Sequence, residues 1–204
     1  MRLTGVLRTA PLHLYYTTRV ADAHGLGRCE NYWISASFGD GLMAQSYILR
    51  LRKDVTGAIE QPLLPAGVAL RTLGPNPDMA LVKGMHAVLE AGYWEGGGGA
   101  PVFGQWWKAL RKDYEFDPSL VLLAVDAEGV VGMAQCWQSA FVKDLAVHPR
   151  ARRRGVGRAL MLAVFHEFAG RGATHVDLRT REENSNAQAF YRALGMTLVS
   201  RDPS

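Results

Sequence analysis

The 204-residue sequence predicts an α/β fold: a mixed central sheet flanked by helices, with a small β-rich N-terminal extension. Residues 120–125 form a continuous apolar run that ends in turn-forming residues at 126–129, which is typical of a buried strand. A second apolar strand at 141–147 is followed by a helix at 155–169 with one apolar face. Strands and helices that alternate in this way build a sheet covered by helices.

The main domain is assigned to residues 66–204, with the element order βααβββαβα. Asp78 is the predicted N-cap of the first helix, and the four glycines at 96–99 are a loop. A second helix is expected at 105–114; its Trp106 and Trp107 suit core packing, with a ligand platform as the alternative. The remaining elements are strands at 68–73, 130–139 and 176–180 and a last helix at 185–194 before Gly195.

Residues 1–62 form the predicted N-terminal extension. Segments 12–20, 31–37 and 45–52 are rich in β-branched and aromatic residues and are separated by glycines, which indicates short antiparallel strands. Residues 61–65, which contain two prolines, are the expected linker to the main domain.

Composition argues against several classes of protein. The net charge is +4 and the pI is about 9.2, but the basic excess is concentrated at 150–158 without interleaved aromatic residues, which disfavours a nucleic-acid partner. No apolar run approaches the roughly 18 residues of a membrane span, and no signal peptide is recognised, so we expect a cytoplasmic protein without a membrane partner. Cys29 and Cys136 lack zinc-site spacing, and no metal is expected.

The connection between the strand at 141–147 and the following helix has five arginines among residues 150–158. Cations at a helix N-terminus oppose the helix dipole, which favours a bound anion on the free N–H groups there. Gly155 and Gly157 lack a Cβ, so the backbone can approach such an anion, and arginine donors match phosphate oxygens. The segment predicts a phosphate or pyrophosphate site; a solvated basic helix start remains the alternative.

Two motifs resemble those of the GNAT superfamily of N-acetyltransferases. Arg152-x-x-Gly155-x-Gly157 is similar to the acyl-CoA-binding motif of that family. Asn184-x-x-Ala187-x-x-x-Tyr191-x-x-x-Gly-Met resembles its Asn-x-x-Ala-x-x-x-Tyr-x-x-x-Gly-Phe, with methionine in the last position. Together with the element order, the resemblance covers about two-thirds of the chain.

The resemblance implies an acetyl-CoA-dependent N-acetyltransferase whose acceptor is a primary amine of a small molecule or peptide that attacks the thioester directly. It implies that Tyr191 is the catalytic general acid, that Asn184 holds the pantetheine arm and that the Val147 N–H faces the acyl oxygen. The implied cofactor-binding residues are Leu145, Ala146, Val147, Arg152, Arg153, Arg154, Gly155, Val156, Gly157, Arg158, Asn184, Ala187 and Tyr191.

The general base is left unassigned. Lys143 stands where many GNAT proteins carry a glutamate, and Asp144 should point to the opposite face if the strand is regular. Glu95, Glu182 and Glu183 are other candidates to line the acceptor pocket. A non-catalytic CoA- or acyl-CoA-binding module is therefore the alternative function, and a nucleic-acid-binding protein is a third hypothesis. Acceptor specificity is expected from residues 74–118, whose aromatic residues favour an apolar or cationic acceptor.

The chain departs from the family pattern at its C-terminus. GNAT folds usually have two strands after the last helix, whereas only residues 197–200 suggest one here. The N-terminal region resembles the boundary between the halves of tandem GNAT proteins of the mycothiol synthase type, which suggests a reduced first repeat. Its strand at 47–51 is expected to fill the sheet edge left open, because unpaired edges invite aggregation. A homodimer is kept as an option.

Overall fold

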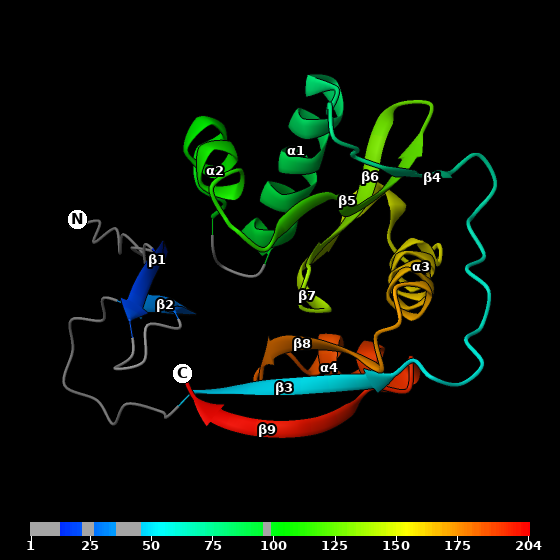
Figure 1. Cartoon of the computed structure of the whole chain (residues 1–204). Helices are drawn as coiled ribbons and strands as arrows, with labels where there is room; N and C mark the ends of the chain where they lie inside the picture. The colour runs from blue at the N-terminus through cyan, green and yellow to red at the C-terminus, as the bar shows by residue number, and fades with distance from the viewer. Residues whose placement is uncertain (1–12, 22–26, 36–45, 96–98) are drawn as a thin grey trace, which may run out of the picture.

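The computed structural model describes residues 13–21, 27–35, 46–95 and 99–204, with side chains for 46–92 and 99–204. Its main element is a seven-stranded sheet with the strand order β4-β5-β6-β7-β8-β3-β9 (Figure 1). Neighbouring strands are antiparallel except β7 and β8, which are parallel. The strands are β3 (Tyr47–Asp54), β4 (Ala69–Thr72), β5 (Phe116–Asp126), β6 (Gly129–Trp137), β7 (Phe141–Val147), β8 (His175–Arg181) and β9 (Thr197–Pro203).

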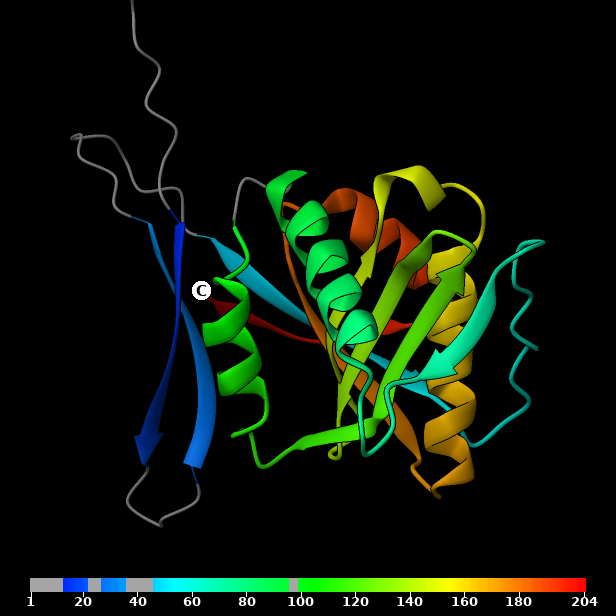
Figure 2. The ribbon, with the colours of Figure 1, turned by 90° about the horizontal axis from the view of Figure 1, so that it is seen from above.

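Helices cover both faces of this sheet, and the predicted fold class is confirmed. On one face, α1 (Met79–Glu95) contacts β6 and β7, and α2 (Phe103–Leu110) shares its apolar core. On the other face, α3 (Val156–Gly170) packs across β5 to β8, and α4 (Ser185–Ala193) adds Phe190 and Tyr191 to that core (Figure 2). None of the described helices combines the length and apolarity needed to cross a bilayer.

The start of α1 and the end of α2 have identifiable causes. The Asp78 carboxylate accepts a hydrogen bond from the Ala80 N–H at 2.8 Å, which confirms Asp78 as the cap of α1. Helix α2 ends at Leu110, earlier than the predicted residue 114, because Asp113 bonds back to the Leu110 carbonyl in a turn and its carboxylate accepts from the Trp137 indole at 3.0 Å. Trp106 is 6% exposed and packs in the core, whereas the side chains of Tyr93 and Trp94 lie outside the described residues.

The N-terminal segment contributes to two sheets. β1 (His13–Ala21) and β2 (Gly27–Ser35) form an antiparallel pair that overlaps the strands predicted at 12–20 and 31–37, although residues 12, 36 and 37 lie outside the described part. β3 joins the main sheet as expected, but it lies between β8 and β9 rather than at the edge. The position of β3 differs from the expectation because β9 extends to Pro203, beyond the predicted strand at 197–200, and is long enough to form the edge of the sheet itself. The division between residues 62 and 66 stays a prediction.

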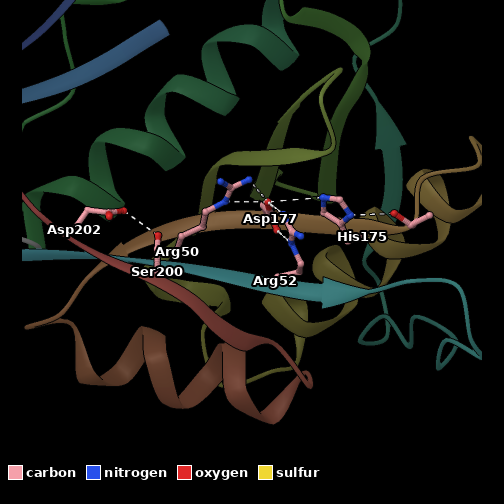
Figure 3. A network of polar contacts seen from close by, with 7 residues as sticks. Arg50, Arg52, His175, Asp177, Ser200 and Asp202 are labelled. Carbon is pink, nitrogen blue, oxygen red and sulfur yellow. Dashed lines mark hydrogen bonds and ion pairs between the residues drawn. The ribbon is translucent and has the colours of Figure 1, made fainter.

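A salt-bridge network joins β3 to β8 (Figure 3). Both Arg50 and Arg52 donate to the buried Asp177 carboxylate, at 2.5 and 3.0 Å from Arg50 and at 2.7 and 2.8 Å from Arg52. Burial raises the pKa of Asp177, but the hydrogen bonds from Arg52 and Arg50 outweigh it, so the net pKa lies below the usual value. Asp177 therefore stays ionised and ties the N-terminal strand to the rest of the sheet.

Candidate active site

The parallel strands β7 and β8 separate soon after they meet. Their only paired residues are Phe141 with Asp177 and Val142 with Leu178, whereas β7 continues alongside β6 as far as Val147. Residues 143–147 of β7 therefore have one edge that β8 does not cover. An exposed strand edge of this kind can accept an extended ligand through backbone hydrogen bonds.

The register shows which backbone groups face the open edge. The His148 N–H donates to the Val131 carbonyl at 2.9 Å, so the pair Val147 and Gly132 is a non-hydrogen-bonded pair of the antiparallel ladder. In such a pair the N–H and C=O groups point away from the partner strand, so those of Val147, and of Leu145 two residues earlier, point toward the side of β8. Arg152 Nε already donates to the Val147 carbonyl at 3.0 Å, whereas the Val147 N–H remains directed at the opening.

The open edge leads into a turn that is rich in backbone donors. A short 3₁₀ helix, η1 (Pro149–Ala151), is followed by Arg153 and Gly155 with φ of 58° and 87°, and α3 then begins at Val156. Left-handed residues that alternate with ordinary ones turn successive N–H groups to one side, which makes an anion-binding concavity. Among the described residues, no acceptor bonds the backbone N–H groups of residues 153–158. The predicted anion site therefore has a matching backbone geometry.

The five arginines of this turn have different roles. Arg150 makes a bidentate pair with Asp126, at 2.5 and 2.9 Å, and Arg158 pairs with Glu60 at 2.5 Å. Arg152 supports the Val147 carbonyl. Arg153 and Arg154 are exposed, and among the described residues their guanidinium groups contact no carboxylate. These two side chains are the ones best placed to meet phosphate groups.

Close packing holds α3 against the sheet behind this turn. A Cβ built on Gly132 would lie 2.8 Å from Val156 Cγ1 and 2.9 Å from Leu160 Cδ1. A Cβ on Gly157 would lie at ordinary contact distance, 3.4 Å from Val147 and 3.5 Å from Phe190. Gly132 of β6, which the sequence reasoning did not single out, thus allows the first turn of α3 to approach the strands.

Tyr191 lies on α4, on the α3 side of the sheet, and Asn184 is the N-cap residue just before that helix. Burial, and then the charge of Asp144, raise the pKa of Tyr191 to about 12, so the half-buried phenol is protonated at neutral pH and can donate a proton. Asn184 Oδ1 caps α4 by accepting from the Ala187 N–H at 3.0 Å. The Asn184 amide nitrogen therefore remains as the group that can reach a ligand.

The strand β7 is irregular at Lys143 and Asp144, which occupy the positions considered for a catalytic general base. A register shift between Gln135 and Cys136 of β6 lies opposite Lys143, so β7 does not alternate regularly there. The expectation that Lys143 and Asp144 point to opposite faces required a regular strand and therefore does not apply. Lys143 Nζ lies 3.2 Å from the carboxylate of Asp144, which is buried. Glu182 is engaged by Arg201 at 2.6 and 2.7 Å, Glu183 is exposed, and the side chain of Glu95 lies outside the described residues.

Gln135 is a polar residue that sequence reasoning missed. It is fully buried on β6 opposite Asp144, and neither its Nε2 nor its Oε1 has a hydrogen-bond partner among the described residues. The strand Gly129–Trp137 is otherwise apolar, so a single amide within it was the available signal. A buried amide without partners is costly, so the α1 face of β6 carries a polar group that the described residues leave unsatisfied.

Comparisons with known proteins agree with this architecture. The family model described as Acetyltransferase (GNAT) family matches residues 90–196. A mycothiol acetyltransferase of Saccharomonospora viridis is 34% identical over 161 residues, which are 70% of this chain and 50% of that protein. One from Thermobispora bispora is 29% identical over 175 residues, covering 78% of this chain and 56% of that protein.

Solved structures give the same result for the fold. A GCN5-related N-acetyltransferase from Sphaerobacter thermophilus superposes with a TM-score of 0.64 at 27% identity, covering 77% of this chain and 50% of that one. A tandem GNAT protein from the clavulanic acid biosynthesis pathway has a TM-score of 0.54 at 19% identity over 78% of this chain and 52% of that one. The chain spans about half the length of the curated relatives it matches. The split between β7 and β8, the donor-rich turn and the family match over more than half of the sequence lead to one conclusion: this chain belongs to the GNAT family of acetyltransferases.

Proposed function

We propose that the protein is an acetyl-CoA-dependent N-acetyltransferase that acts on a primary amine of a small molecule or peptide. One observation carries the proposal: the open edge of β7 runs directly into a turn whose N–H groups at 153–158 have no acceptor among the described residues. An extended pantetheine arm fits the edge, and a pyrophosphate fits the turn. Acetyl-CoA supplies an activated thioester there.

The residues of the chain have distinct tasks in this reaction. The Val147 N–H is directed at the opening and can stabilise negative charge on the acyl oxygen. The Asn184 amide nitrogen holds the arm from the α4 side, and the Tyr191 phenol donates a proton to the departing thiolate.

Direct attack by the amine is favoured over transfer through Cys136, whose side chain the structure describes. Burial, and then the charges of Asp144 and Glu167, raise the pKa of the Cys136 thiol, so it is a poor nucleophile without access to substrate. A buried thiol without a disulfide also suits a cytoplasmic location, which we include in the proposal.

A CoA-binding module without turnover is the second candidate. The observation in its favour is that Asp144, the single carboxylate of β7, is buried and bonded to Lys143. An amine that arrives uncharged attacks the thioester without a base, and the proton that its nitrogen loses as the amide forms restores the Tyr191 phenol, so transfer does not require a carboxylate.

The test separates the two functions. Calorimetry measures CoA binding to the full chain, and a thiol-reactive dye measures CoA release from acetyl-CoA with a panel of primary amines. Amine-dependent release supports the acetyltransferase, whereas tight binding without release supports the module. Replacement of Gly155 and Gly157 by valine should weaken CoA binding; unchanged affinity would remove the basis of both proposals.

A further inference from the structure

A group of cations lies on the face of β3 and β8 that is turned away from α4. Arg50 of β3 and Arg179 of β8 are register partners, so their side chains leave the sheet on the same face. Figure 3 shows Arg50 and Asp177 on the side of β8 opposite α4. Like charges directly across two strands destabilise a sheet, and Asp177 bonds only the Arg50 member of this pair, so Arg179 lacks a compensating negative charge.

The protein supplies only part of that charge. Asp177 bonds both Arg50 and Arg52, so two guanidinium groups already occupy this carboxylate and neither belongs to Arg179. Asp54 of β3 accepts from Thr56 at 2.7 Å, and Asp202 of the neighbouring β9 accepts from Ser200 at 2.8 Å; neither carboxylate bonds Arg179. Arg179 itself is exposed and contacts no carboxylate among the described residues.

The position of Arg179 connects this charge with the active site. Leu178 is the last residue of β8 that pairs with β7, so Arg179 is the first residue where the two strands separate. Leu178 packs in the core under α3, so its neighbour Arg179 points to the opposite face, which is the α1 side of the sheet. The donor-rich turn leads into α3, which covers the opposite face of the sheet.

Gln135 marks the same face independently. It is paired with Val121, which belongs to the core under α1, so its unpartnered amide also lies on the α1 side. β7 lies between β6 and β8, so Gln135 and Arg179 lie on the same face of the sheet, on the two sides of β7.

We propose that Arg179, with Arg50 behind it, binds an anionic group of the acceptor. The acceptor class is then a primary amine that carries a carboxylate or a phosphate, in place of the apolar or cationic acceptor suggested by the aromatic residues. This inference rests on the proposed function, because it assigns the α1 side of the opening to the acceptor.

The experiment uses matched pairs of probes that differ in one anionic group. Glucosamine 6-phosphate against glucosamine tests phosphate, and L-alanine against L-alaninamide tests carboxylate. Binding of each probe to the full chain saturated with CoA is measured by calorimetry, and CoA release from acetyl-CoA gives kcat/KM. We expect the wild type to prefer the anionic member of one pair by about tenfold or more, as expected for a charge-assisted hydrogen bond.

The variants assign the preference to one side chain. Arg179→Gln should abolish it, and Arg179→Lys should retain part of it, while the KM for acetyl-CoA stays unchanged in both. Arg71→Gln is the matched control, because Arg71 is an exposed strand arginine on β4 at the opposite edge of the sheet. It removes the same charge and should leave the preference intact.

The outcomes distinguish the inference from the proposed function. If no amine is acetylated, the proposed function fails and the binding ratios alone decide the inference. Equal or undetectable binding of both members of each pair overturns the inference even when transfer occurs. A preference that survives Arg179→Gln, or one that Arg71→Gln also removes, overturns it as well.

Discussion

Replacement of Gly132 by alanine tests whether close packing behind the donor-rich turn supports cofactor binding. The added methyl group would lie 2.8 Å from Val156 Cγ1, and relief to an ordinary contact of 3.4 Å requires a shift of several tenths of an ångström. Val156 is β-branched, fully buried and the first residue of α3, so its side chain cannot simply rotate away. The first turn of α3 must move instead.

The cost can be estimated from this geometry. An extra methyl group in a packed core destabilises a protein by about 1–3 kcal/mol. For a chain of this size each kcal/mol lowers the Tm by about 2–4 °C, so we expect a fall of about 2–12 °C in differential scanning calorimetry. Because the displaced turn carries the N–H groups at 156–158, CoA affinity should fall about three- to tenfold, which corresponds to about 1 kcal/mol.

The matched control is Gly170→Ala at the other end of the same helix. A Cβ at Gly170 meets nothing within 4 Å, and alanine is the better helix former, so its Tm should be unchanged or slightly higher. CoA affinity should not change. If Gly132→Ala has the Tm and CoA affinity of the wild type, the close approach of β6 and α3 does not support the site.

Three further predictions follow from named contacts. Tyr191→Phe should slow CoA release about tenfold to a hundredfold, the low end for a general acid because a thiolate is a tolerable leaving group, and calorimetry should give unchanged CoA affinity. Burial and the charge of Asp144 raise the pKa of Tyr191 to about 12, so the Tyr191 phenol should stay protonated up to about pH 11. Any fall in kcat of the wild type between pH 7 and about pH 11 should therefore also occur in Tyr191→Phe. Combined Arg153→Gln and Arg154→Gln should weaken CoA binding and flatten its dependence on salt; an unchanged salt slope would show that neither guanidinium meets a phosphate. Asp177→Asn should lower the free energy of unfolding at pH 7 by about 2 kcal/mol, less than for a fully buried pair because Arg50 and Arg52 are more than one-third exposed. The pKa of Asp177 is lower in the folded wild type than in the unfolded chain, where it is about 3.9, so the extra stability is fully present above that pH. It is lost as the pH falls through the pKa of the folded state. Unfolding followed by circular dichroism should show this acid-dependent loss in the wild type and not in Asp177→Asn.

Local features of the site were predictable from the sequence because their causes are local. The glycine at 155 is needed for a left-handed residue before α3, and the arginines that follow β7 mark the turn. Asp78 and Asn184 cap their helices through hydrogen bonds that span two or three residues. Such features depend on residue type and short spacing, so a single sequence carries them.

Features that depend on distant partners were not predictable. The register shift opposite Lys143 depends on how β6 lies against β7, and alternation within β7 alone does not reveal it. The place of β3 between β8 and β9 depends on a pairing across more than a hundred residues. Gln135 offered a signal, a lone amide in an apolar strand, but its lack of partners is a property of the packed structure.

The position of β3 connects the N-terminal segment with the sheet that carries the candidate active site. β3 is the neighbour of both β8 and β9, so a chain that began at residue 66 would leave both strands without that partner. It would also remove both arginines that pair with Asp177, and a buried carboxylate without cations is strongly destabilising. Arg50 opposes Arg179 at the point where β7 and β8 separate. The same strand therefore completes the sheet and supplies charge to the side of the opening where we place the acceptor.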